Sequence, residues 1–79
     1  MRKYELIPTD GHKSFYGKAI VVCNGGVDTL YSYGVKIATK TATGHIIRHW
    51  DGWTATTGRH IKAFCGMNKA EFTKLEVIA

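Results

Sequence analysis

The sequence has few of the residues that enzymes and disulfide-bonded secreted domains depend on. It contains six acidic residues, two cysteines and one proline among 79 residues. We find no P-loop, no G-x-S-x-G element and no recognisable carboxylate pair in it. No set of acid, base and nucleophile can be assembled from such a sequence. We therefore predict that the chain is not an enzyme and has no catalytic residues.

The sequence also lacks a long apolar segment. Its longest strongly apolar run, Ala19–Cys23, is far shorter than the ~20 residues of a membrane-spanning helix. Met1-Arg2-Lys3 resembles the start of a signal peptide, but Glu5, Pro8 and Asp10 interrupt the apolar stretch that would have to follow. We expect no membrane contact and a cytoplasmic location.

The two cysteines, Cys23 and Cys65, are too few to form the disulfide framework of a small secreted domain. Each lies among apolar neighbours, where a free cysteine behaves as a small hydrophobic side chain. This favours two buried, reduced thiols, with a disulfide as the alternative.

Neither a repeat nor a linker divides the chain. A chain of this length buries only roughly 60% of the surface that it exposes when unfolded. Its hydrophobic content of 44% is typical of a folded protein. We therefore predict one domain that spans residues 1–79.

Most of the chain shows strand patterns. Asn24-Gly25-Gly26 predicts a tight hairpin turn centred on Asn24-Gly25, because type I′ turns need positive φ at both central positions. Alternation after Gly34, which permits a kink, places Val35, Ile37 and Thr39 on one face of a strand. The predicted strands are Lys3–Ile7, Gly17–Cys23, Val27–Tyr33, Val35–Lys40, His45–Trp50 and, at the end of the chain, Lys74–Ile78.

One segment, Thr56–Cys65, has helical periodicity. Its apolar stripe consists of Thr57, Ile61, Phe64 and Cys65. Thr54 or Thr56 is suited to cap its start, and Gly66 suits the left-handed residue after its last turn. Asn68 is placed to cap a further short turn. Together these patterns predict an α+β fold, a small antiparallel sheet of about four to six strands with one main helix, residues 56–65, packed on it.

The net charge of +5 is concentrated in the second half of the chain. The basic residues there are Lys36, Lys40, Arg48, Arg59, Lys62, Lys69 and Lys74. Such a surface attracts phosphate or an acidic protein. The alternative is an ordinary solvated face.

The start of the predicted helix is the sharpest candidate site. Free N–H groups and the helix dipole favour anions at this position. The residues that we predict to bind an anion or a partner are Thr56, Thr57, Arg59, His60, Arg48 and Lys62. Ordinary capping is the alternative for the two threonines.

His45 and His49 have the spacing that on a helix places two imidazoles beside one zinc ion. On a strand the same residues lie ~13 Å apart, too far to share an ion. We predict no metal and no cofactor. Aromatic pairs such as Phe15-Tyr16 lie between basic residues, a pattern typical both of single-strand stacking platforms and of small cores.

Three segments together resemble a family of short uncharacterised proteins encoded by gut-type Gram-positive bacteria, their phages and their plasmids. They are Lys13-Ser14-Phe15-Tyr16-Gly17-Lys18-Ala19, Leu30-Tyr31-Ser32-Tyr33 and Gly52-Trp53-Thr54-Ala55-Thr56-Thr57-Gly58-Arg59-His60-Ile61. The resemblance extends from residue 13 to about residue 75 and includes Asn68-Lys69-Ala70-Glu71-Phe72. The resemblance implies an accessory protein of a mobile element in a bacterial cytoplasm. It brings no catalytic residue and no ligand.

We therefore expect a non-catalytic module that binds a host or phage protein. The alternative is a nucleic-acid-binding module that uses the basic half and exposed aromatic rings. An exposed apolar patch favours the first function, and a basic groove lined with aromatic side chains favours the second.

Overall fold

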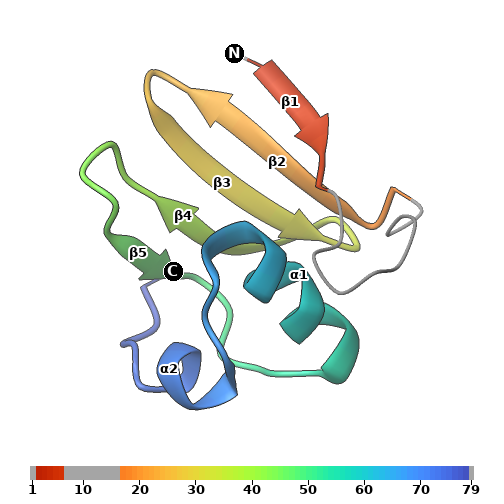
Figure 1. Ribbon diagram of the computed structural model, residues 1–79, viewed down its shortest axis with the longest axis vertical. Coiled ribbons are helices and arrows are strands. Elements are labelled where there is room, and N and C mark those ends of the chain that lie inside the picture. The colour runs from red at the N-terminus through yellow and green to blue at the C-terminus, as the bar shows by residue number, and fades with distance from the viewer. Residues whose placement is uncertain (1, 7–16, 79) are drawn as a thin grey trace.

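The computed structural model describes residues 2–6 and 17–78 (Figure 1). Five antiparallel strands form one sheet in the order β1-β2-β3-β4-β5, so each strand pairs with its neighbours in the chain. The elements are β1 (Arg2–Glu5), β2 (Ala19–Asn24), β3 (Val27–Ser32), β4 (Val35–Lys40), β5 (Ile46–Arg48), α1 (Ala55–Cys65) and α2 (Lys69–Thr73). The predicted α+β class is confirmed.

A two-residue turn joins β2 to β3. Asn24 pairs with Val27, and the two residues between them, Gly25 and Gly26, have φ values of 60° and 85°. Only glycine adopts two consecutive positive φ values without steric cost. The predicted hairpin is confirmed, but its centre is Gly25-Gly26, one residue later than predicted.

A second two-residue turn joins β3 to β4. Ser32 pairs with Val35, and the intervening Tyr33 and Gly34 have φ values of 52° and 79°. The sequence predicted only a kink here, because a tyrosine with positive φ is uncommon. The backbone N–H of Tyr33 donates to the carbonyl of Lys18, 2.8 Å away, which helps to hold this conformation.

A bulge in β4 changes which side chains reach the core. Leu30 pairs with Ala38 and the next residue, Tyr31, pairs with Lys36, so Ile37 is the extra residue. Ile37 and Ala38 are both buried in the core. The predicted alternation of Val35, Ile37 and Thr39 on one face is therefore wrong, since Thr39 lies on the other face, opposite Thr29.

Helix α1 has the predicted caps. The Thr54 hydroxyl accepts from the N–H of Thr57 at 3.1 Å, and Gly66 takes the left-handed conformation with φ of 77°. The indole of Trp53 lies against Gly58, where a Cβ atom would come within 2.7 Å of ring atom Cε2. Trp53 precedes the N-cap residue Thr54, and Gly58 is the fourth residue of α1. A contact between these two positions is a hydrophobic staple. It holds the chain that leads into α1 against the first turns of this helix.

The chain after α1 forms a short helix and then runs along β5. Asn68 and Glu71 make a reciprocal capping box at the start of α2. The predicted last strand, Lys74–Ile78, is wrong, because this segment makes only an isolated parallel bridge through Arg48 and Val77. The N–H of Ile78 donates to the carbonyl of Arg48 at 2.7 Å.

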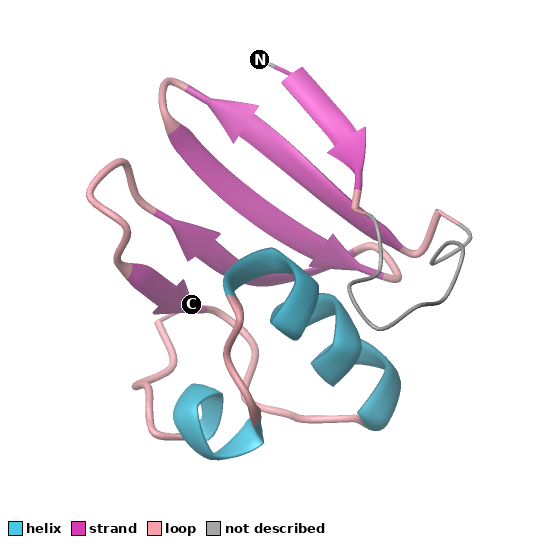
Figure 2. Cartoon of the chain, in the orientation of Figure 1, coloured by secondary structure: helices cyan, strands magenta, loops and turns pink. Residues whose placement is uncertain are grey.

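Both helices lie on the same face of the sheet (Figure 2), and the core fills the space between the sheet and the helices. Its buried side chains are Leu6, Ala19, Val21, Leu30, Ile37, Ala38, Ile61, Phe64 and Phe72. Cys23 and Cys65 are free thiols, as predicted, but both are half-buried rather than fully buried. No helix in residues 2–6 and 17–78 is long and apolar enough to cross a membrane.

Candidate functional site

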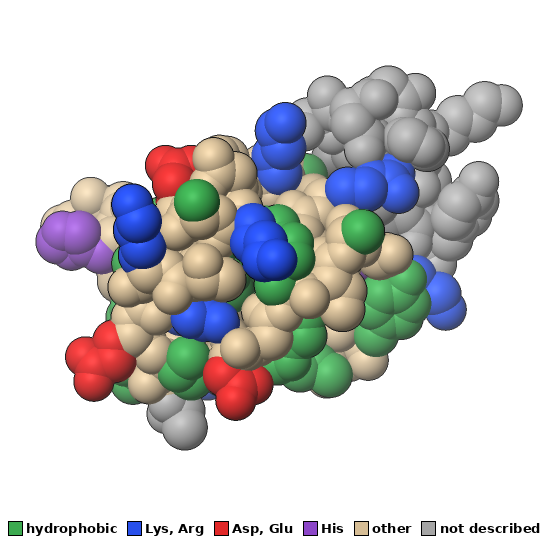
Figure 3. Space-filling view, turned by 90° about the horizontal axis from the view of Figure 1, so that it is seen from below, with side chains coloured by type: hydrophobic (Ala, Val, Ile, Leu, Met, Phe, Trp, Pro, Cys, Tyr) green, Lys and Arg blue, Asp and Glu red, His purple; other side chains and the backbone are tan. Residues whose placement is uncertain are grey.

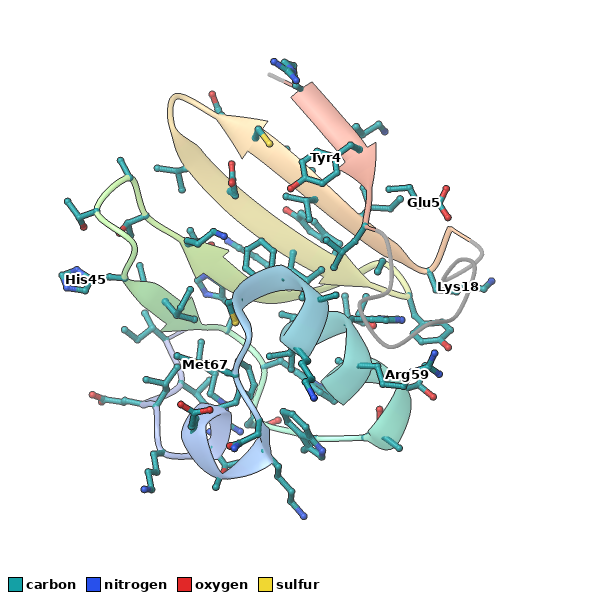
Figure 4. All side chains as sticks on the ribbon, in the orientation of Figure 1. Tyr4, Glu5, Lys18, His45, Arg59 and Met67 are labelled. Atoms are coloured by element: carbon teal, nitrogen blue, oxygen red, sulfur yellow. The ribbon has the colours of Figure 1, made fainter. Side chains whose placement is uncertain are left out.

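The predicted site at the start of α1 divides into side chains that face inward and side chains that face outward. Thr57 and His60 are buried, with 6% and 1% of their surface exposed. Thr56 and Lys62 are exposed. Arg59 is half-buried and lies on the outer side of the helix (Figure 4).

The two inward side chains belong to a buried polar cluster with Ser32 of β3. The Ser32 hydroxyl lies 2.7 Å from Nδ1 of His60 and 3.1 Å from the Thr57 hydroxyl. Burial, and then the positive charge of Arg59, lower the pKa of His60. The ring is therefore neutral at physiological pH, and the cluster hydrogen-bonds α1 to the sheet.

The same cluster contains a hydroxyl next to an imidazole, the arrangement of an activated serine nucleophile. A nucleophile must be reached by its substrate, yet Ser32 and His60 are 2% and 1% exposed. We interpret the cluster as a structural link between the two layers. The sequence did not single out Ser32, because nothing local shows that it will meet a residue 28 positions later.

Arg48 of β5 is occupied on the other side of the core. Its guanidinium donates to the carbonyls of Trp50 at 2.8 Å, Leu75 at 3.2 Å and Thr73 at 3.3 Å. It also lies over the ring of Phe72, 5.0 Å from the centroid. Arg48 thus fastens α2 and the last residues to the sheet, while Lys62 lies in the last turn of α1. The six predicted residues do not converge on one point.

The two histidines with zinc-like spacing, for which no metal site was predicted, lie in different surroundings. Nδ1 of His49 lies 2.6 Å from the carbonyl of Ile78, and its Nε2 lies 2.8 Å from the Thr39 hydroxyl. His45 is exposed in the turn before β5 and points away from the molecule (Figure 4). Among residues 2–6 and 17–78, no three His, Cys, Asp or Glu side chains lie close enough to hold a metal ion. The absence of a bound metal stays a prediction.

A different surface emerges on the sheet face that the helices leave free. In an antiparallel sheet, directly opposite residues share a face. One row runs Lys3, Val22, Thr29, Thr39 and Ile47 across the strands, and the next runs Glu5, Ile20, Tyr31 and Lys36. We call these nine residues the uncovered face.

Burial values show that no described helix lies over the β2 and β3 part of this face, whereas Thr39 of β4 is only 8% exposed and is hydrogen-bonded to His49. On the helix side of β2 and β3, Val21 and Leu30 are fully buried. Their neighbours on the other side, Ile20, Val22 and Tyr31, remain partly exposed. Antiparallel sheets with one solvated face usually carry polar residues there, so apolar side chains on this face need another explanation.

A hollow of about 360 Å³ lies at the β1 end of the uncovered face. Arg2, Lys3, Val22 and Tyr31 line it. Lys36 is directly opposite Tyr31 in the neighbouring strand. Sequence reasoning missed this group, because Val22 belongs to a continuous apolar run that reads as a strand buried on both faces.

The aromatic side chains have mixed roles. Trp50 and Trp53 pack against the core, whereas Tyr33 is 55% exposed at the β3–β4 turn. Phe15-Tyr16 lies outside the described residues. In the view from below, lysines and arginines are scattered among acidic and uncharged side chains (Figure 3). The view shows no single basic groove on that side.

Comparisons with known proteins place the chain in a family. No curated protein and no solved structure matches it. The model of the Family of unknown function (DUF8033) matches residues 3–78, almost the whole chain. The protein therefore belongs to the DUF8033 family.

Proposed function

We propose that this protein is a non-catalytic module that binds another protein through the uncovered face of its sheet. The observation that carries the proposal is the chemistry of this face. Ile20, Val22 and Tyr31 are partly exposed at adjacent positions of two strands. Contiguous apolar side chains on a soluble domain mark an interaction surface more often than chance exposure.

Tyr31 is the expected anchor of the interaction. Aromatic residues are enriched in the centres of protein interfaces, where they carry a large share of the binding energy. Tyr31 stands on rigid backbone, since β3 pairs with strands on both sides. Little side-chain entropy is therefore lost when a partner covers it.

Nucleic acid is the second candidate, and the hollow is the observation that favours it. Lys3 and Tyr31 both line the hollow, and a cation near an aromatic ring suits a phosphate and a base. Sheets that read single-stranded RNA stack two or three bases on aromatic side chains. In the two rows of the uncovered face Tyr31 is the one aromatic residue, so a protein partner fits better.

The setting that we propose is a bacterial cytoplasm, where the protein acts as an accessory factor of a mobile element on a host or phage protein. The motif resemblance described above supports this setting. The half-buried free thiols of Cys23 and Cys65 fit a reducing compartment.

Capture by the immobilised protein tests the proposal. The parent, Tyr31→Ala and Tyr4→Ala are compared in a lysate of a gut-type Gram-positive bacterium, with and without nuclease. Tyr4 is a matched control, because it is 46% exposed and lies on the helix side of the sheet, opposite Val21 (Figure 4).

We expect a protein that the parent and Tyr4→Ala retain in the presence of nuclease, and that Tyr31→Ala loses. Equal retention by all three proteins contradicts the proposal. Loss of the captured protein on nuclease treatment supports the nucleic-acid function instead.

A further inference from the structure

We infer that the uncovered face binds an extended acidic segment of the partner, with one carboxylate in the hollow beside β1. This inference rests on the proposed function and names the chemistry of the partner. It arises from the arrangement of charged and apolar side chains on the face. The helix start, which the sequence favoured, takes no part in it.

The hollow itself has two kinds of lining. Val22 and Tyr31 supply an apolar surface, and Lys3 supplies positive charge. Arg2 also borders the hollow, but it is opposite Cys23, so its side chain lies on the helix side of the sheet. A ligand that fits both kinds of lining therefore combines an anionic group with an aliphatic body, as an aspartate or glutamate next to a branched apolar residue does.

A second cation lies on the far side of the apolar residues. Lys36 is opposite Tyr31 on β4, three strand spacings and one row away from Lys3. These steps separate the two Cα atoms by roughly 16 Å. Residues four apart in an extended segment point to the same side and lie ~13 Å apart. Flexible lysine side chains cover the difference.

This spacing implies a partner segment in which every second residue contacts the face, and these residues are in turn acidic, apolar and acidic. Its central apolar residue contacts Ile20 and Tyr31 between the two lysines. Glu5 is the one carboxylate in the two rows, and it accepts a hydrogen bond from the N–H of Gly17 at 2.8 Å. The charge on the face is therefore mainly positive, which complements an acidic segment.

A selection of random short peptides for binding to the immobilised protein tests the inference. The target is the parent or the charge-reversed variant Lys3→Glu/Lys36→Glu. The control, Lys62→Glu/Lys69→Glu, changes the net charge by the same amount at exposed positions of the two helices. Circular dichroism verifies that each variant is folded.

We expect peptides selected by the parent and by the control to alternate acidic and aliphatic residues. Their affinity for Lys3→Glu/Lys36→Glu should fall about tenfold, since two attractive exposed pairs become repulsive. A selection against that variant should enrich lysine and arginine instead. Oligothymidylate should not compete with the selected peptides.

Peptides without an acidic preference, or acidic peptides that bind both variants equally, overturn the inference. The proposed function then still stands if Tyr31→Ala loses the captured protein and Tyr4→Ala keeps it. Competition by oligothymidylate that depends on Lys3 and Tyr31 assigns the face to nucleic acid and overturns the inference as well. The two experiments therefore distinguish a failure of the inference from a failure of the proposed function.

Discussion

At the scale of single residues, hydrogen bonds between buried polar side chains determine how α1 meets the sheet. Ser32, Thr57 and His60 satisfy one another across the interface. In the described part of the chain, every buried side-chain nitrogen and oxygen has a partner. An unsatisfied buried group costs about 1–3 kcal/mol, so substitution within this cluster should affect the whole domain.

His60 should make the protein sensitive to acid. Its folded pKa lies below the ordinary value, because burial and Arg59 disfavour the charged ring. The unfolded state therefore binds a proton first as the pH falls. This contribution to stability is complete above the unfolded pKa of about 6.5 and is lost as the pH falls through the lowered folded pKa.

Urea unfolding across this pH range measures the effect. His60→Gln should show a flatter pH dependence than the parent, whereas His45→Gln, at an exposed position, should behave like the parent. If His60→Gln and the parent lose stability in parallel on acidification, His60 is not the responsible group.

Gly58 should resist substitution by alanine, although alanine usually stabilises a helix interior by about 1 kcal/mol relative to glycine. A methyl group there would press on the indole of Trp53, and such overpacking costs roughly 1–3 kcal/mol. We expect Gly58→Ala to lower the free energy of unfolding of the parent. In a Trp53→Ala background the same substitution should raise the free energy of unfolding. Thermal denaturation of the parent, the two single variants and the double variant tests this expectation.

At the scale of elements, the two tight turns set the register of the sheet. The φ values of Gly25 and Gly26 are both positive, so a β-branched side chain at either position is strained. We expect Gly25→Val to destabilise the protein by roughly 1–3 kcal/mol. Gly25→Asn should cost much less, because asparagine tolerates the left-handed region. Equal melting temperatures for Gly25→Val and the parent would contradict this turn.

Local chemistry allowed most of the elements to be predicted from sequence. The glycines after Asn24 and the caps Thr54 and Gly66 act within a few residues of themselves, so the hairpin and α1 were found nearly in place. The bulge at Ile37 was not foreseen, because it depends on how β3 and β4 pair. Tyr33 was not recognised as a turn residue, because its positive φ is uncommon for a tyrosine.

At the scale of the whole molecule, Arg48 holds the last residues against the sheet. Its substitution by methionine removes the charged donor of the carbonyls of Thr73 and Leu75, and a hydrogen bond to a charged group contributes roughly 1.5–3 kcal/mol. We expect Arg48→Met to unfold at lower urea concentration and to lose amide-exchange protection at Ile78. Lys69→Met, at an exposed position, is the control that should change neither. Unchanged protection at Ile78 in Arg48→Met would contradict the role of Arg48.

The candidate site shows where sequence reasoning reached its limit. Arg48 was placed in a binding site because it is basic and lies near the helix start in sequence. Its actual partners are carbonyls up to 27 positions later in the chain. The uncovered face was missed because Val22 and Tyr31 are typical core residues, and only the whole fold shows which of its faces the helices leave free.

The central claim is that the partner covers the uncovered face, and lysine acylation in the complex tests it most directly. The captured protein is mixed with the parent, and the acylation rate of each lysine is compared with that in the free protein. We predict that Lys3 and Lys36 react several-fold more slowly in the complex, while Lys62 and Lys69 on the helices react at unchanged rates. Protection of Lys62 or Lys69, with Lys3 and Lys36 as reactive as before, would contradict the account.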